Sequence, residues 1–324
     1  MQPDQAHPVQ PQPDCASLAG TKLAGAESAG AESDRTEPGL AGSGLAKPGH
    51  TEPSSPLRDR ARLDAERLLL HVLGSGKNKA WLMTHLEEEL SAAEAARYSR
   101  LIERRSQGEP IQYITGETEF YGLPFRVTLD VLIPRPETEH LVEKVIELAA
   151  QFKNPHIVDV GTGSGAIAVA LAHELARAQL QAQVTAIDLS SQALKIAEEN
   201  ARRNGVYLRF LQGDLLAPVA GERFEIIVSN PPYVPSEDRA SLSIEVRDHE
   251  PALALFAGED GLEVYRRLIP AAFDALTPGG FVALEIGFGQ SSAIATLLIG
   301  SGFEQIEFIP DLQGIPRVAC ARRP

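Results

Sequence analysis

The sequence predicts an α/β protein in which a small helical bundle precedes a mostly parallel seven-stranded sheet with helices on both faces. Two observations support this prediction. Short apolar segments alternate with helical patterns from residue 137 onward, as they do when parallel strands are joined by crossover helices. Helical patterns without strands occupy residues 57–107. The chain is therefore expected to carry one large α/β domain behind a small helical one.

Seven apolar segments are expected to form the strands. They are His156–Val160, Gln183–Asp188, Leu208–Gln212, Glu225–Ser229, Phe281–Ile286, Glu304–Ile309 and Arg317–Ala321. Helical stretches are expected between the first five strands, including Ser191–Arg203, with Ser190 as its N-cap and Gly205 beyond its end. Only a short Pro-Asp-Leu-Gln-Gly-Ile-Pro turn joins the last two strands, which is too short for a crossover helix. These two strands are therefore expected to close the sheet as an antiparallel hairpin.

The chain ahead of the sheet divides into three regions. Residues 1–56 hold 8 of the 23 prolines and 7 of the 27 glycines, with no aromatic residue, and predict a disordered low-complexity tail. Residues 57–107 predict a helical domain, in which Ser91 and Glu94 have the spacing of a capping box. Residues 108–136 form a proline-punctuated connector with a β-hairpin around Phe120–Val127. Residues 137–324 are then expected to form the α/β domain, in which the catalytic residues are expected to lie.

Composition narrows the class of protein. The 30 basic and 44 acidic residues give a net charge of −14, which argues against stable nucleic-acid binding. The two cysteines, Cys15 and Cys320, make no disulfide framework, and Cys15 is expected to be a free thiol. No run of about 18 apolar residues is present, so no transmembrane helix is expected, and no secretory signal is expected either. We expect a cytoplasmic protein that is not bound to a membrane.

A glycine-rich loop follows the first predicted strand and precedes an apolar helix. Such a loop brings backbone close to a ligand and presents the N–H groups of a helix N-terminus. The spacing is Gly-x-Gly-x-Gly, and Ala166 stands where a dinucleotide-binding loop would have its last glycine. The loop residues expected to bind a cofactor are Gly161, Thr162, Gly163, Ser164 and Gly165.

Acidic residues follow the next two strands. Asp188 ends the second strand, where a carboxylate can accept hydrogen bonds from ribose hydroxyls. Asp214 and Leu215 follow the third strand and could contact the edge and face of an adenine. This combination is similar to the S-adenosylmethionine site of Rossmann-like methyltransferases, and a nicotinamide-dependent enzyme is the alternative.

The fourth strand ends in Asn230-Pro231-Pro232-Tyr233, at the sheet edge where ligands bind. An amide NH2 is a poor nucleophile because its lone pair is delocalised, but a site that accepts both of its protons can fix the nitrogen. The Asn230 side-chain oxygen can accept one proton and the Pro231 carbonyl the other. Tyr233 can stack on the planar group and narrow the slot. This chemistry predicts methyl transfer to a planar NH2 nitrogen, with Asn230, Pro231 and Tyr233 as catalytic residues and Pro232 also binding substrate.

Asn-Pro-Pro-Tyr is typical of methyltransferases that act on adenine in DNA or on glutamine in proteins. Two further segments, Gly108–Gly116 with Phe120–Gly122 and Val131–Glu139, resemble the connector of the peptide chain release factor glutamine methyltransferases, the PrmC/HemK family. The resemblance extends from about Leu63 to Arg322 and leaves out the first 56 residues.

The resemblance implies methylation, from S-adenosylmethionine, of the side-chain amide nitrogen of the glutamine in the Gly-Gly-Gln motif of release factors. It implies that Gly161–Gly165 contact the methionine part of the cofactor and that Asp188 holds the ribose. Leu215 stands where family members often carry an aromatic residue beside adenine. Asn230–Tyr233 would hold the glutamine, with Asn230 also near the cofactor's methyl group.

Other functions are kept open. The alternatives are a glutamine methyltransferase acting on a ribosomal protein, an adenine-N6 DNA methyltransferase and a catalytically inactive binding module. Release factors are the expected protein partners, the chain is expected to be a monomer, and no metal is expected. Arg135 and Glu137 could line the mouth of the site or form a surface pair that locks the connector. His249–Pro251 is expected to be a structural loop, and Glu285 is not expected to be catalytic.

Overall fold

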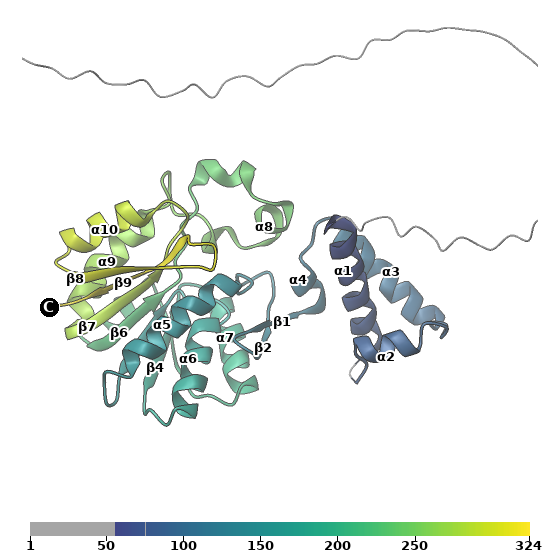
Figure 1. Ribbon diagram of the computed structural model, residues 1–324, viewed down its shortest axis with the longest axis horizontal. Coiled ribbons are helices and arrows are strands. Elements are labelled where there is room, and N and C mark those ends of the chain that lie inside the picture. The colour runs from purple at the N-terminus through teal and green to yellow at the C-terminus, as the bar shows by residue number, and fades with distance from the viewer. Residues whose placement is uncertain (1–55, 75) are drawn as a thin grey trace, which may run out of the picture. The chain divides into compact units, whose positions relative to one another are not determined.

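The computed structural model describes residues 56–74 and 76–324 (Figure 1). The disordered tail predicted for residues 1–56, with Cys15, lies outside this part of the chain except for Pro56. Pro56 already belongs to a helix, so the helical region begins one residue earlier than expected. The region up to residue 116 holds α1 (Pro56–Leu73), α2 (Lys79–Thr84), α3 (Ala92–Ser106) and α4 (Ile111–Thr115).

The first helices begin and end where their capping residues predict. Gly74 follows α1 with a φ of +87°, which a residue without a side chain adopts at low cost. The Asn78 side chain accepts a hydrogen bond from the Trp81 N–H at 2.9 Å and caps α2. The capping box of α3 forms between Ser91 and Glu94. One apolar cluster joins α1, α3 and α4, and it contains Leu68, Val72, Leu101, Ile111 and Ile114.

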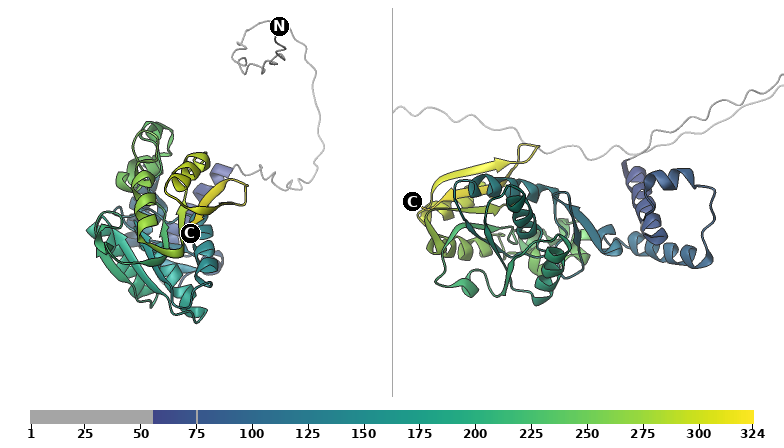
Figure 2. Two further views of the ribbon diagram at one scale, coloured as in Figure 1. Left: turned by 90° about the vertical axis from the view of Figure 1, so that its left-hand side faces the viewer. Right: turned by 90° about the horizontal axis from the view of Figure 1, so that it is seen from below.

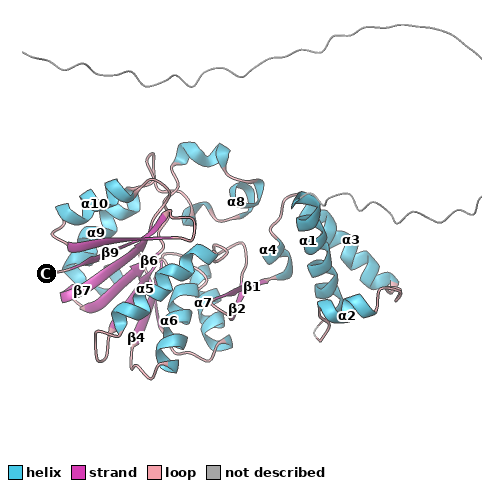
Figure 3. Ribbon diagram, in the orientation of Figure 1, coloured by secondary structure: helices cyan, strands magenta, loops and turns pink. Residues whose placement is uncertain are grey.

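The connector contains a helix that the sequence pattern does not indicate. Pro110 is the N-cap of α4 and Gly116, with a φ of +79°, ends it after five residues, which is too short for an apolar period to be recognised. The hairpin of β1 (Glu117–Phe120) and β2 (Leu123–Arg126) follows, with Tyr121 and Gly122 both at positive φ in its turn. Figure 3 shows this hairpin as a separate two-stranded element beside α7.

A buried amide attaches the hairpin to the domain behind it. Asn200, fully buried in α7 (Ser191–Arg203), accepts from the Arg126 N–H at 2.7 Å and donates to the Arg126 carbonyl at 3.0 Å. Its NH2 group also donates to the Ser164 carbonyl at 2.8 Å. One side chain thus joins the hairpin, α7 and the glycine loop.

The main sheet has seven strands in the order β5-β4-β3-β6-β7-β9-β8. Its strands are β3 (His156–Val160), β4 (Gln183–Asp188), β5 (Arg209–Gln212), β6 (Phe224–Ser229), β7 (Leu276–Glu285), β8 (Glu304–Pro310) and β9 (Pro316–Arg322). The neighbours from β5 to β7 pair in parallel, whereas β9 pairs antiparallel with both β7 and β8. The predicted sheet and its closing hairpin are confirmed.

Two predicted details of the sheet are wrong. The connection from β5 to β6 contains only the 3-10 turn η2 (Ala217–Val219) and no α-helix. β7 starts at Leu276 rather than at Phe281. Its early part is extended because Gly279 and Gly280 exchange backbone hydrogen bonds with Arg323, and a Pro-Gly-Gly segment alone gives no sign of that distant partner.

Helices cover both faces of the sheet (Figures 1 and 2). On one face α5 (Glu139–Ala149), α6 (Ala166–Arg177) and α7 pack over an apolar cluster that includes Ile157 and Ile226. On the other face α9 (Glu263–Ala275) and α10 (Ser291–Gly300) pack over a cluster that includes Val158 and Ile227. A loop with α8 (Ile244–His249) and the 3-10 turns η3 (Ser236–Ser241) and η4 (Ala252–Ala254) lies between β6 and α9, while η1 (Pro136–Thr138) precedes α5.

Candidate active site

A cavity of about 500 Å³ opens at the carboxyl ends of β3, β4 and β6. The chain leaves β3 toward β4 on one side and returns to β6 on the other, so this is the point where the strand order reverses. Open α/β sheets bind ligands at such a point because the two diverging loops leave a crevice. The loop residues in its wall include Gly161, Thr162, Gly163, Ser164, Asp188, Asp214, Leu215, Asn230 and Pro232.

The glycine loop adopts a conformation that requires glycine. Gly161 and Gly163 have φ values of +74° and +55°, and a Cβ on either would meet no atom within 4 Å. Since Gly163 lines the cavity, its missing side chain leaves room there for a ligand. Gly165, at φ +81°, is needed for a second reason, because its Cβ would lie 3.0 Å from the Cβ of Ala197 in α7.

The buried carboxyl group of Asp159 supports the glycine loop through a hydrogen bond to Thr162. The Thr162 hydroxyl donates to Oδ2 of Asp159 at 2.7 Å, and Asp159 is fully buried. Burial raises the pKa of Asp159 to about 7, and the Thr162 hydrogen bond opposes that rise. Oδ1 of Asp159 has no hydrogen-bond partner among the described residues.

Asp188 orders the same loop from the end of β4. Its two carboxylate oxygens accept from the backbone N–H groups of Gly163 and Ser190, both at 2.8 Å. Burial raises the pKa of Asp188, while these two N–H groups lower it. Each oxygen keeps a second lone pair, and the side chain lines the cavity, so Asp188 can still accept hydroxyl groups of a ligand.

The third segment, after β5, contains a partner that the sequence does not reveal. Asp214 forms an ion pair with Arg267 of α9, and both side chains are about half exposed at the cavity wall. Leu215 lies beside them with a φ of +51°, an uncommon conformation for a branched residue. Asp214 is therefore already held by a cation, which leaves Leu215 as the apolar contact that this segment offers.

The Asn-Pro-Pro-Tyr segment does not line the cavity as a whole. Asn230 and Pro232 lie in the cavity wall, whereas the buried Pro231 and the half-buried Tyr233 do not. Ser229, just before the segment, donates to the Val160 carbonyl at 2.6 Å and ties the end of β6 to the end of β3. The segment is thereby held at the strand reversal.

Two buried polar residues lie behind this segment: Thr138, which the sequence does not single out as a site residue, and Glu285, which is not expected to be catalytic. The Asn230 NH2 group donates to the Thr138 hydroxyl at 3.2 Å, and that hydroxyl donates to Glu285 at 2.6 Å. The Tyr233 hydroxyl lies 3.4 Å from the other oxygen of Glu285. Thr138 lies within the segment Val131–Glu139 that the sequence singles out, but nothing in the sequence marks its hydroxyl as part of the site.

The connector reaches the site through an ion pair different from the expected one. Arg135, in the cavity wall, pairs with the buried Glu250 of the loop after β6, while Glu137 is exposed. Burial raises the pKa of Glu250 and Arg135 opposes that rise. Arg135 thus locks the connector, but to Glu250 rather than to Glu137.

The cavity fits S-adenosylmethionine in space and in charge. The open space beside Gly163 and the acceptors of Asp188, both in the cavity wall, suit a ligand with hydroxyl groups and positive charge. In residues 56–74 and 76–324, no three His, Cys, Asp or Glu side chains are grouped to hold a metal ion. No helix of the same residues is long and apolar enough to span a bilayer.

Comparison with known proteins identifies the class. The family model "Methyltransferase small domain" matches residues 137–246, and "PrmC N-terminal domain" matches residues 56–116. Among solved structures, the catalytic domain of hMettl16 with a 3′UTR hairpin aligns with 76% of this chain and 93% of its own, at a TM-score of 0.51 and 15% identity, which shows the fold alone. The chain is an S-adenosylmethionine-dependent methyltransferase.

Relatives in sequence identify the family. The chain is 45% identical over 264 residues to a release factor glutamine methyltransferase of Koribacter versatilis, covering 81% of this chain and 91% of that relative. It is also 45% identical to the enzyme of the same name from Moorella thermoacetica, over 82% of this chain and 92% of the relative. The chain belongs to the release factor glutamine methyltransferase family, which confirms the resemblance noted in its sequence.

Proposed function

We propose that this protein transfers the methyl group of S-adenosylmethionine to the side-chain amide nitrogen of the glutamine in the Gly-Gly-Gln motif of peptide chain release factors. The observation that carries the proposal is the position of Asn230, in the wall of the same cavity as the glycine loop. The names of the relatives support release factors over a ribosomal protein or DNA as the substrate.

Asn230 and Pro231 hold the substrate amide in this proposal. The Asn230 NH2 group is engaged by Thr138, so Oδ1 remains to accept one amide proton, and the Pro231 carbonyl accepts the other. Tyr233 closes the slot from the side of Glu285. The cofactor supplies an activated methyl group, so the protein mainly aligns the acceptor nitrogen with it.

The glycine loop and the acidic residues bind the cofactor. Gly161–Gly165 would contact its methionine part and Asp188 its ribose. Asp214 and Leu215 would flank the adenine, with Leu215 giving an apolar contact where an aromatic ring would stack. The lining of one cavity by all three segments supports these assignments.

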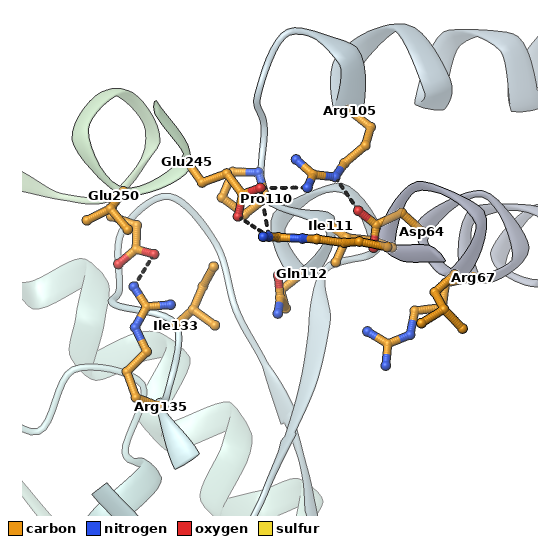
Figure 4. A pocket seen from close by; sticks show the side chains of 13 residues that line it. Asp64, Arg67, Arg105, Pro110, Ile111, Gln112, Ile133, Arg135, Glu245 and Glu250 are labelled. Atoms are coloured by element: carbon orange, nitrogen blue, oxygen red, sulfur yellow. Dashed lines mark hydrogen bonds and ion pairs between the residues drawn. The ribbon is translucent and has the colours of Figure 1, made fainter. Parts of the chain in front are cut away.

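The helical domain docks the release factor in this proposal. A second cavity, of about 310 Å³, lies between α1, the connector and α8 (Figure 4). Arg105 lies between Asp64 and Glu245 there, and Arg135 reaches Glu250 (Figure 4). This cavity shares Arg135 with the first one, so a protein bound there would lie next to the site of methylation.

The test is single-turnover transfer of labelled methyl to a purified release factor. Asn230→Ala should lower the rate by about 10³-fold or more, with little change in cofactor binding, because orientation can supply roughly 7–11 kcal/mol of barrier lowering. Asn154→Ala, an exposed asparagine in the loop before β3, is the matched control and should react normally. A release factor with Gln→Glu in the Gly-Gly-Gln motif should accept no methyl group, because a carboxylate has no NH2. A near-normal rate with Asn230→Ala or with the Glu substrate would refute the proposal.

A further inference from the structure

A buried hydrogen-bond chain runs from the Asn-Pro-Pro-Tyr segment into the protein. Thr138 and Glu285 are 4% and 3% exposed, so neither exchanges its partners freely with water. Thr138 ends η1 at the start of α5, and Glu285 is the last residue of β7. Thr138 lies in the cavity wall beside Asn230, whereas Glu285 does not line the cavity. The hydroxyl of Thr138 is engaged by Asn230 and Glu285, and Glu285 meets the segment through Thr138 and Tyr233.

The direction of each hydrogen bond follows from the donors available. The Thr138 hydroxyl has one proton, and its distance of 2.6 Å to Oε2 of Glu285 is that of a strong bond to a carboxylate. The oxygen of Thr138 then offers only lone pairs to Asn230, and the amide group facing it at 3.2 Å is the NH2 end. Tyr233 donates to the other oxygen of Glu285. Every proton in the chain points toward Glu285.

This direction matters because the two ends of an asparagine amide have nearly the same shape but opposite roles. With its NH2 toward Thr138, Asn230 presents an acceptor in the opposite direction. With the amide turned over, its oxygen would face the lone pairs of Thr138, and its NH2 would face the incoming substrate NH2. Only the first orientation can accept a substrate proton.

We propose that Thr138 and Glu285 are positioning residues that fix the amide of Asn230 with its oxygen toward the substrate, and this inference rests on the proposed function. Glu285 takes the Thr138 proton, and Thr138 in turn accepts from Asn230. Neither residue touches the reacting atoms. Their contribution appears in the rate of methyl transfer and not in the affinity for cofactor or release factor.

The charge state of Glu285 decides whether the chain keeps its direction. The hydroxyls of Thr138 and Tyr233 contact this carboxyl group. The charge of Glu137 in η1 raises its pKa, and that of Arg317 in β9 lowers it. The Tyr265 hydroxyl of α9 binds its backbone carbonyl at 2.6 Å. Burial raises the pKa of Glu285 to about 7. Once protonated, Glu285 can donate to Thr138, which frees the Thr138 proton to point at Asn230.

The experiment compares the wild type with Thr138→Val, Thr138→Ser and Glu285→Gln. Single-turnover methyl transfer to the release factor should fall about 10- to 100-fold in Thr138→Val, as expected for a misaligned acceptor. Thr138→Ser keeps the hydroxyl and should stay within about 3-fold of the wild-type rate. The KM for release factor and the Kd for S-adenosylhomocysteine should change less than about 2-fold in each variant. Thr185→Val, which removes another buried hydroxyl in β4, is the matched control and should react normally.

The pH profile separates positioning from a merely structural role. The wild-type rate should fall as the pH drops through about 7, and Glu285→Gln should be slower than the wild type and lose this acid limb. A wild-type rate in Thr138→Val, no rescue by Thr138→Ser, or an unchanged acid limb in Glu285→Gln would overturn the inference. If the wild type itself fails to methylate the release factor, the proposed function fails instead. Because Glu285→Gln keeps shape and polarity, it provides the test even if Thr138→Val does not fold.

Discussion

Burial of the Glu285 carboxyl group lowers the free energy of unfolding at neutral pH. Its pKa rises from 4.5 to about 7 because burial disfavours the charge more than Thr138 and Tyr233 favour it. Between these two values the folded protein holds a proton that the unfolded chain has released. The free energy of unfolding therefore falls as the pH rises through this window, and the loss is complete above pH 7.

Glu285→Gln should remove this loss in the free energy of unfolding. The glutamine stays neutral, so above pH 7 the variant should be more stable than the wild type by about 1–3 kcal/mol. The difference should shrink as the pH falls toward 4, where both folded proteins carry a neutral group. Urea unfolding at pH 8 and pH 4.5 measures it, with the exposed Glu119→Gln as control. A variant less stable than the wild type at pH 8 would contradict this account.

Two substitutions test the cofactor loop. Gly163→Val should project a side chain into the cavity, where the glycine leaves open space. Asp188→Ala removes the acceptor of the Gly163 N–H together with those offered to a ribose. Both should weaken S-adenosylhomocysteine binding by roughly 10-fold or more in calorimetric titration, since losing a charge-assisted hydrogen bond costs about 1.5–3 kcal/mol.

Gly205→Val controls for backbone strain in that comparison. Gly205 has a φ of +67° and equally open surroundings, but it lies after α7, away from the cavity. The Gly205→Val variant should therefore lose stability as Gly163→Val does, but keep its affinity for S-adenosylhomocysteine. Wild-type affinity in both cofactor-loop variants would remove the basis for the cofactor assignment.

At the scale of elements, α8 connects the loop after β6 to the helical domain. Glu245 of α8 accepts from Arg60 of α1 at 2.9 Å and from Arg105 of α3 at 2.6 Å. Arg105 also holds Asp64 at 2.7 Å, so one guanidinium joins two helices of the bundle to this loop. The pair between Arg105 and Asp64 is only 17% and 14% exposed, which limits screening by solvent.

Glu245→Ala should therefore weaken use of the intact release factor. We expect its KM to rise about 5- to 30-fold, the equivalent of about 1–2 kcal/mol, because the docking domain loses its link to the loop. A short peptide with the Gly-Gly-Gln motif does not need that link and should react equally well with both proteins. Glu237→Ala, exposed in the same loop, is the control. An equal loss with peptide and release factor would place the effect in the site itself.

Elements were predictable where the signal is local. Ser190 and Gly205 bracket α7, and Ser191–Arg203 has the bounds expected of it. The five residues of α4 are too few to show a period, and β7 extends back to Leu276 because of its pairing near Arg323. The missed features were thus a helix too short to show a period and a strand extension whose partner lies far along the chain.

At the scale of the whole molecule, residues 1–55 should be dispensable. The cavity that would bind the cofactor is lined by residues 129–267. A chain that begins at Pro56 should methylate release factor as the full chain does, and one that begins at Gly108 should lose that activity and keep some cofactor affinity. Labelled-methyl transfer and calorimetry on the purified truncations measure both. Loss of activity on removing residues 1–55 alone would contradict the expectation.

The site was predictable as far as its motifs reach the cavity. The glycine loop, Asp188 and Asn230 each stand at the end of a predicted strand, and the strand order brings them to one crevice. Arg267, Thr138 and Glu285 come from three other elements and meet the motif residues only after folding. Sequence spacing carries no information about such contacts, so Arg267 and Thr138 were not singled out, and the contacts of Glu285 with the motif were not predicted.

The buried contacts of Asn200 affect how a mutational scan of this protein should be interpreted. Its amide uses both ends, accepting from Arg126 and donating to Arg126 and Ser164. Aspartate would lose the donors, glutamine would overfill a fully buried space, and alanine would leave three groups unpaired. A mutational scan should therefore find Asn200 as intolerant of substitution as Asn230, although Asn200 does not line the cavity. Intolerance alone would misassign Asn200 to the chemistry, and only a binding assay separate from a folding assay tells the two asparagines apart.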